Sequence, residues 1–162
     1  MTNKGTSDSS QVKARLDHPI IDADGHWLEF GPLVREEMKK IGGQAAVDGF
    51  SFFPKLVQKE LAMSVADRRA NGTGQQAFWA LPTKNTRDRA TAVIPKLLYE
   101  RLDEFGFDFS VMYPTAGLGL PLIPDPKQRQ AACRAFNTFS ADYFAEYSDR
   151  LTPSAVIPMH TP

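Results

Sequence analysis

The sequence predicts an α/β protein built on about three parallel strands. Three short β-favourable runs alternate with segments whose apolar residues recur at helical spacing. The segments between the runs are long enough to hold helices, and such crossovers join parallel strands in right-handed units. Of the 162 residues, 42% are hydrophobic and 23% are charged, a balance typical of a protein with one globular core.

The first strand is expected over Ile20 to Asp24, where a short apolar run leads into polar residues. A helix should begin at Pro32 and stop at Gly42 and Gly43, because proline favours the first helical turn and glycine ends helices. A second, short helix is expected from Pro54 to about Val65. The stretch from Asp67 to Thr91 contains glycines, Pro82 and several charges, and it predicts a long inserted surface loop.

The second half of the chain has clearer boundaries. An amphipathic helix is predicted from Pro95 to its carboxyl cap at Gly106. The second strand should run over Phe107 to Tyr113 and lead into a glycine-rich turn. Asp125 is then expected to cap a long helix with an apolar face, and a third strand should cover Leu151 to Ile157. Residues 1–16 are polar and predict a mobile leader that precedes a single domain over 17–162.

Composition excludes several classes of function. The 19 Lys and Arg residues balance 19 Asp and Glu residues, which argues against a nucleic-acid partner recruited by net charge. No apolar run reaches the roughly 18 residues that would predict a membrane span, and the amino terminus does not resemble a secretory signal. A single cysteine, Cys133, allows no internal disulfide. We therefore expect a soluble cytoplasmic protein without a membrane or nucleic-acid partner.

Candidate metal ligands follow the first strand. Residues two apart in a strand point to the same side, so Asp22, Asp24 and His26 are expected along one side where that strand ends. A carboxylate and an imidazole are suitable ligands for a divalent cation. The competing interpretation of this short motif is a turn at Asp24 and Gly25 followed by a partly exposed histidine.

Other candidate site residues are less specific. Tyr113 and Thr115 follow the second strand, where barrel enzymes place substrate-binding groups, although the tyrosine ring could simply be packed. His160 follows the third strand and could reach the same edge, or be exposed and without a role. The inserted loop contains four arginines that could bind a substrate carboxylate, but a solvated charged loop is the preferred interpretation: Arg68, Arg69, Arg87 and Arg89.

Three segments together resemble one family. They are IDADGHWLEF, DRATAVIPKLLYERLDEFGFDFSVMYPTAGLGL and RAFNTFSADYFAEYSDRLTPSAVIPM. In this order they resemble the amino-terminal part of the amidohydrolase-related proteins, in particular the branch of aminocarboxymuconate semialdehyde decarboxylase. The resemblance implies a (β/α)8 TIM-type barrel with a divalent metal, zinc first and manganese as the alternative. It places metal ligands at Asp24 and His26, where many members have two histidines, and gives Asp22 no ligand role.

The resemblance also implies the type of reaction. Members of the family are metal-dependent hydrolases or nonoxidative decarboxylases, so we expect a small organic substrate, with a carboxylate-bearing compound among the candidates. Such a barrel needs about 250 residues, and 162 supply about three of its eight strands. We therefore expect an amino-terminal fragment of an enzyme, inactive alone. The alternative is a truncated noncatalytic α/β chain that needs a partner, such as a second copy, to complete its barrel.

Overall fold

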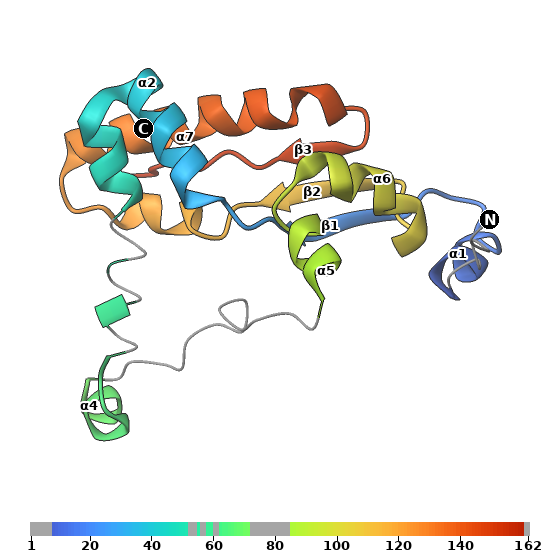
Figure 1. Cartoon of the computed structure of the whole chain (residues 1–162), viewed down its shortest axis with the longest axis horizontal. Coiled ribbons are helices and arrows are strands. Elements are labelled where there is room, and N and C mark those ends of the chain that lie inside the picture. The colour runs from blue at the N-terminus through green and yellow to red at the C-terminus, as the bar shows by residue number, and fades with distance from the viewer. Residues whose placement is uncertain (1–7, 52–54, 56–57, 60–61, 72–84, 161–162) are drawn as a thin grey trace.

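The computed structural model describes residues 8–51, 55, 58–59, 62–71 and 85–160 (Figure 1). Its elements, in chain order, are α1 (Asp8–Lys13), β1 (Ile21–His26), α2 (Gly31–Phe50), α4 (Val65–Ala70), α5 (Thr86–Thr91), α6 (Pro95–Phe105), β2 (Phe109–Tyr113), the 3-10 helix η2 (Gly117–Leu122), α7 (Pro126–Phe144), the 3-10 helix η3 (Ala145–Tyr147) and β3 (Leu151–Pro153).

The three strands form one parallel sheet in the order β1-β2-β3, which confirms the predicted α/β class. Helices separate each pair of consecutive strands along the chain, as parallel pairing requires. In Figure 1 the strands run side by side, with α1 near one end of the sheet and α2 near the other. The carboxyl ends of all three strands therefore lie at the same edge of the sheet.

Helix α6 has the boundaries that its sequence predicts. Pro95 occupies its first turn, and Gly106 caps its carboxyl end with a φ of 83°, in the left-handed region that favours glycine. Leu102 from the predicted apolar face is fully buried. Asp125 likewise caps α7, because its carboxylate accepts a hydrogen bond of 2.6 Å from the backbone N–H of Gln128.

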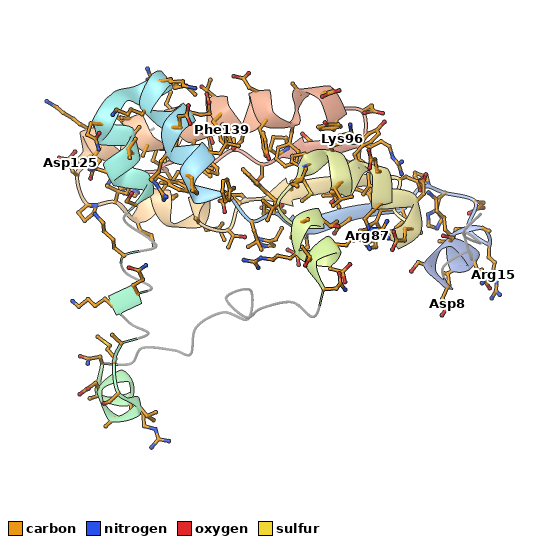
Figure 2. The ribbon with its side chains drawn as sticks, viewed as in Figure 1. Asp8, Arg15, Arg87, Lys96, Asp125 and Phe139 are labelled. Carbon is orange, nitrogen blue, oxygen red and sulfur yellow. The ribbon has the colours of Figure 1, made fainter. Side chains whose placement is uncertain are left out.

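The core lies mainly between α7, α2 and the segment after β1. The Trp27 ring is surrounded by aromatic side chains of α7, with ring centroids 5.2 Å from Phe144 and 6.1 Å from Phe136. Phe50 of α2 also stacks on Phe136, with ring centroids 6.1 Å apart. Figure 2 shows Phe139 between α7 and α2 and Asp125 at the start of α7. The aromatic stripe of α7 is therefore core.

The predicted break at Gly42 and Gly43 is confirmed, because Gly43 is non-helical and separates two helical parts of α2, but the second part was not predicted. Gly43 has φ 68° and kinks the chain, but the helix resumes and continues to Phe50. The resumed turns bury Ala46 and Phe50, and Gly49 lies against Ala132 of α7. Burial of this face against α7 stabilises a helix that local glycine content disfavours.

Three further boundaries differ from expectation. β3 is shorter than predicted, because its ladder with β2 ends at the pair Met112 and Pro153. Regular structure begins earlier, since α1 forms within the predicted leader and the Ser10 hydroxyl donates a 3.0 Å hydrogen bond to the Asp103 carbonyl of α6. Of the expected helix over 54–65, residues 54, 56–57 and 60–61 lie outside the described residues, whereas 55 and 58–59 are helical. The predicted loop over 67–91 is wrong at both ends, where α4 and α5 form, and its middle, residues 72–84, lies outside the described residues.

No helix in the described part of the chain is both long enough and apolar enough to cross a bilayer.

Candidate functional site

The candidate metal pair lies at the carboxyl end of β1. The pairing of β1 with β2 shifts between Asp22 and Gly25, so β1 has one extra residue there, a β-bulge. Asp24 lies within this bulge, and its Oδ1 atom is 3.9 Å from His26 Nε2. The Asp24 side chain is 95% exposed and that of His26 is 26% exposed. The bulge therefore brings the two predicted ligands together at the surface.

Asp22 has a different role from its neighbours. Its carboxylate accepts a hydrogen bond of 2.9 Å from the buried Ser110 hydroxyl of β2 and one of 3.1 Å from the Asp24 backbone N–H. The expected alternation that would align Asp22 with Asp24 and His26 is interrupted by the bulge. Asp22 instead fixes the bulge to β2.

Gly25 allows the bulge to lie close to β2. A Cβ atom at this position would lie 2.5 Å from the Ser110 Oγ atom and 2.8 Å from the Val111 carbonyl oxygen. Only glycine tolerates such an approach without displacement of the neighbouring backbone. In place of the turn that the competing interpretation expected, Asp24, Gly25 and His26 form the bulged end of β1.

The other three candidate residues differ in their position relative to Asp24 and His26. Tyr113 pairs with His26 across the sheet, and their ring centroids are 5.9 Å apart. The Thr115 hydroxyl donates a 2.7 Å hydrogen bond to the Trp27 carbonyl, a contact that joins two loops. His160 is exposed in a turn after β3. Tyr113 therefore lies beside the candidate pair of Asp24 and His26.

A cavity of about 610 Å³ opens beside this pair, between the sheet and helices α5 and α6. Its apolar wall consists of Leu98, Leu102, Phe105, Phe107 and Met112. Asp24 and His26 line one part of it, and Asp88 and Arg101 line another. An apolar wall with a few polar groups is typical of a pocket for a small organic ligand.

The Arg101 guanidinium in this cavity is already engaged by acidic groups. It binds both carboxylate oxygens of Glu104, at 2.9 and 2.8 Å, and it donates to Asp88 at 3.0 Å. These bonds lower the pKa of the Glu104 carboxyl, and the bonds from Asn85 and then Arg101 lower the pKa of Asp88. Arg87, labelled on α5 in Figure 2, pairs with the same Glu104 at 3.3 Å. Both cations therefore join α5 to α6.

Sequence reasoning missed Glu29. Its carboxylate accepts three hydrogen bonds from consecutive backbone N–H groups of the loop after β2: Thr115 at 3.0 Å, Ala116 at 2.9 Å and Gly117 at 2.8 Å. Burial raises the pKa of the Glu29 carboxyl above its ordinary value, although these backbone bonds act to lower it. An acidic residue inside an otherwise apolar stretch, WLEF, was the available signal.

The donor atoms fit part of a metal site. Two atoms 3.9 Å apart can both reach one zinc ion at about 2.0–2.2 Å. Among the described residues, however, no group of three or more His, Cys, Asp and Glu side chains is arranged to hold a metal ion. Asp24 and His26 alone are fewer than the about three protein ligands that a catalytic zinc site uses.

Comparisons with known proteins do not place the chain in a family. No family model, no curated protein and no solved structure matches it.

Proposed function

We propose that the chain forms the first three strands of a (β/α)8 barrel enzyme of the amidohydrolase-related type, a metal-dependent hydrolase or nonoxidative decarboxylase. The observation that carries the proposal is the 3.9 Å approach of Asp24 and His26 at the carboxyl end of a parallel strand, beside a cavity of about 610 Å³. Barrel enzymes place their chemistry at this end of the strands. The resemblance of the three sequence segments supports the same assignment.

Asp24 and His26 would hold the divalent cation, for which zinc is the first candidate and manganese the second. When bound, such a cation polarises a carbonyl or carboxylate and lowers the pKa of a water molecule. The apolar wall of Leu98, Leu102 and Phe105 would bind the body of a small organic substrate. Tyr113, beside His26, would lie near the reacting group.

The engaged Arg101 limits how a substrate carboxylate could bind. Its bonds to Glu104 and Asp88 compensate its charge, so it offers a second anion little attraction. A carboxylate-bearing substrate would instead direct that group toward the cation at Asp24 and His26. This arrangement suits a decarboxylase as well as a hydrolase.

Zinc binding to the purified chain tests the proposal. Equilibrium dialysis with metal analysis should find weak binding that is lost in His26→Ala and reduced in Asp24→Asn, because each change removes one of two ligands. His18→Ala and His160→Ala are matched controls that should retain it. Equal zinc content in the chain and in His26→Ala would contradict the proposal and favour the noncatalytic alternative.

A further inference from the structure

The carboxyl ends of β1 and β2 are joined beyond the last strand pair. The backbone N–H of Trp27 donates to the Tyr113 carbonyl at 3.1 Å, and the Thr115 hydroxyl donates to the Trp27 carbonyl at 2.7 Å. Glu29 then accepts from three backbone N–H groups in residues 115–117. We call Glu29, the amides of residues 115–117 and the Thr115–Trp27 bond the strand-end latch.

Glu29 is the centre of the strand-end latch. One of its oxygens, Oε1, accepts from Thr115 and Gly117, and the other, Oε2, accepts from Ala116. A row of consecutive N–H groups forms a concave partial positive charge that suits a carboxylate. Three backbone N–H groups converge on this one side chain, so the contact fixes the loop after β2 against the segment after β1.

The strand-end latch determines where the candidate site residues lie. His26 is three residues before Glu29, and Tyr113 is two residues before Thr115. His26 and Tyr113 are also paired in the sheet at its last rung. The His26 ring lies beside Tyr113 and near Asp24, and the latch joins the two chain segments that directly follow this rung.

We propose that Glu29 is a positioning residue that holds His26 in its metal-binding place through the strand-end latch. The part of this inference that concerns metal rests on the proposed function. The part that concerns the place of the His26 ring does not. Outer groups that orient ligands commonly contribute ten- to a hundredfold to metal affinity.

Asp108 offers a matched control at the opposite end of the same strand pair. Its carboxylate accepts from the Ile20 backbone N–H at 2.8 Å and from Lys13 at 2.6 Å, so it joins the amino ends of β1 and β2. Asp108→Asn therefore weakens the same two strands without touching the latch. A loss of stability alone should affect Glu29→Gln and Asp108→Asn alike.

The experiment uses NMR of histidine side chains, which is simple because the chain has 3 histidines. Glu29→Gln keeps one acceptor oxygen and sets an amide NH2 against a backbone N–H. In metal-free protein it should move the His26 ring signals toward those of the exposed His18 and His160, and Asp108→Asn should not. Zinc titration should then show an affinity at His26 about tenfold lower in Glu29→Gln than in Asp108→Asn.

Thr115→Val provides a second test if Glu29→Gln does not fold. It removes only the hydroxyl bond to Trp27 and should move the His26 signals in the same direction, by a smaller amount. Unchanged His26 signals in the folded variants would overturn the positioning role. If the signals move but the unaltered chain binds no zinc at His26, the positioning role stands and the proposed metal-dependent function fails.

Discussion

Arg101 shows how one buried side chain can join two short elements. Its side chain is 6% exposed, it bridges Asp88 of α5 and Glu104 of α6, and its guanidinium carbon lies 4.8 Å from the centre of the Phe105 ring. The neighbouring Arg87 makes an ion pair with the same Glu104 but is 64% exposed. Variants at these two positions therefore separate the effect of burial on stability from the effect of charge.

Replacement of Arg101 by Met should destabilise the protein by about 1–3 kcal/mol, because it removes several charge-assisted hydrogen bonds from a buried position. Arg87→Met should cost at most about 1 kcal/mol, since exposed ion pairs contribute little. Urea unfolding of both variants measures the difference. Equal losses would show that burial of the Arg101 network does not matter for stability.

The carboxyl groups of the site predict opposite effects of pH on stability. The pKa values of Asp88 and Glu104 are lowered from their ordinary values of 3.8 and 4.5. These two carboxylates therefore stabilise the folded state at pH values above 3.8 and 4.5, and this stabilisation is lost as the pH falls through the lowered pKa values. The pKa of Glu29 is raised from its ordinary value of 4.5. Glu29 therefore stabilises the folded state at pH values below 4.5, and this stabilisation is lost as the pH rises through the raised pKa.

Two variants should reveal these signs in the free energy of unfolding. Asp88→Asn should make the loss of stability on acidification less steep, because one titrating group with a lowered pKa is gone. Glu29→Gln should be less stable than the unaltered chain, and the difference should shrink as the pH rises above about 4.5. Denaturant titrations at a series of pH values measure both, and a difference that grows with pH for Glu29→Gln would contradict the assigned sign.

At the scale of elements, two glycines of α2 serve different purposes. A Cβ at Gly49 would lie 2.7 Å from the Ala132 Cβ of α7, whereas Gly43 has φ 68° and open space around it. In an ordinary helix position, Gly→Ala stabilises by about 1 kcal/mol. Here Gly49→Ala should destabilise by about 1–3 kcal/mol through overpacking, and Gly43→Ala by a similar amount through backbone strain.

Thermal unfolding of the two glycine variants checks these signs. Gln44→Ala is the control on the same helix, because its side chain bonds only the nearby Asp48 at the surface. It should leave the melting temperature nearly unchanged. A higher melting temperature for Gly49→Ala would mean that α2 and α7 pack less closely than the structure has them.

The elements differ in how far local sequence determines them. The boundaries of α6 and the start of α7 were predictable, because Pro95, Gly106 and Asp125 act on their own turns. The continuation of α2 past Gly43 was not, since it depends on contact with α7, which is distant in sequence. The strand-end latch was not predictable either, because Glu29 contacts residues 115–117 only after β1 and β2 pair. In the candidate site, the DGH sequence could be identified as a candidate ligand motif. Its bulge could not be predicted, because a bulge is defined by the pairing of β1 with β2.

At the scale of the whole molecule, the sheet has open edges. Among the described residues no strand pairs with the outer edge of β1 or β3, and Ile21 on β1 is 59% exposed. Unpaired edges favour association with another strand. We expect sedimentation that depends on concentration, and Ile21→Lys should reduce it because a charge on an edge strand opposes pairing.

Val65→Lys is the matched control for this prediction, since Val65 is equally exposed but lies on α4. It should leave the sedimentation unchanged. A single monomeric species at all concentrations would show that the edges of the sheet are protected in solution.

The long separation between β1 and β2 has a consequence for the order of folding. Asp22 and Ser110 are bonded across 88 residues, whereas β2 and β3 are joined by a much shorter crossover through α7. Closing a loop twice as long costs only about 0.6 kcal/mol more, yet that cost precedes any contact it makes possible. We expect β2, α7 and β3 to assemble first and β1 to join last.

In pulsed hydrogen exchange, the Ser110 N–H bonded to Arg150 should gain protection before the Trp27 N–H bonded to Tyr113. Asp24 and His26 would then meet the rest of their site only in the final step of folding.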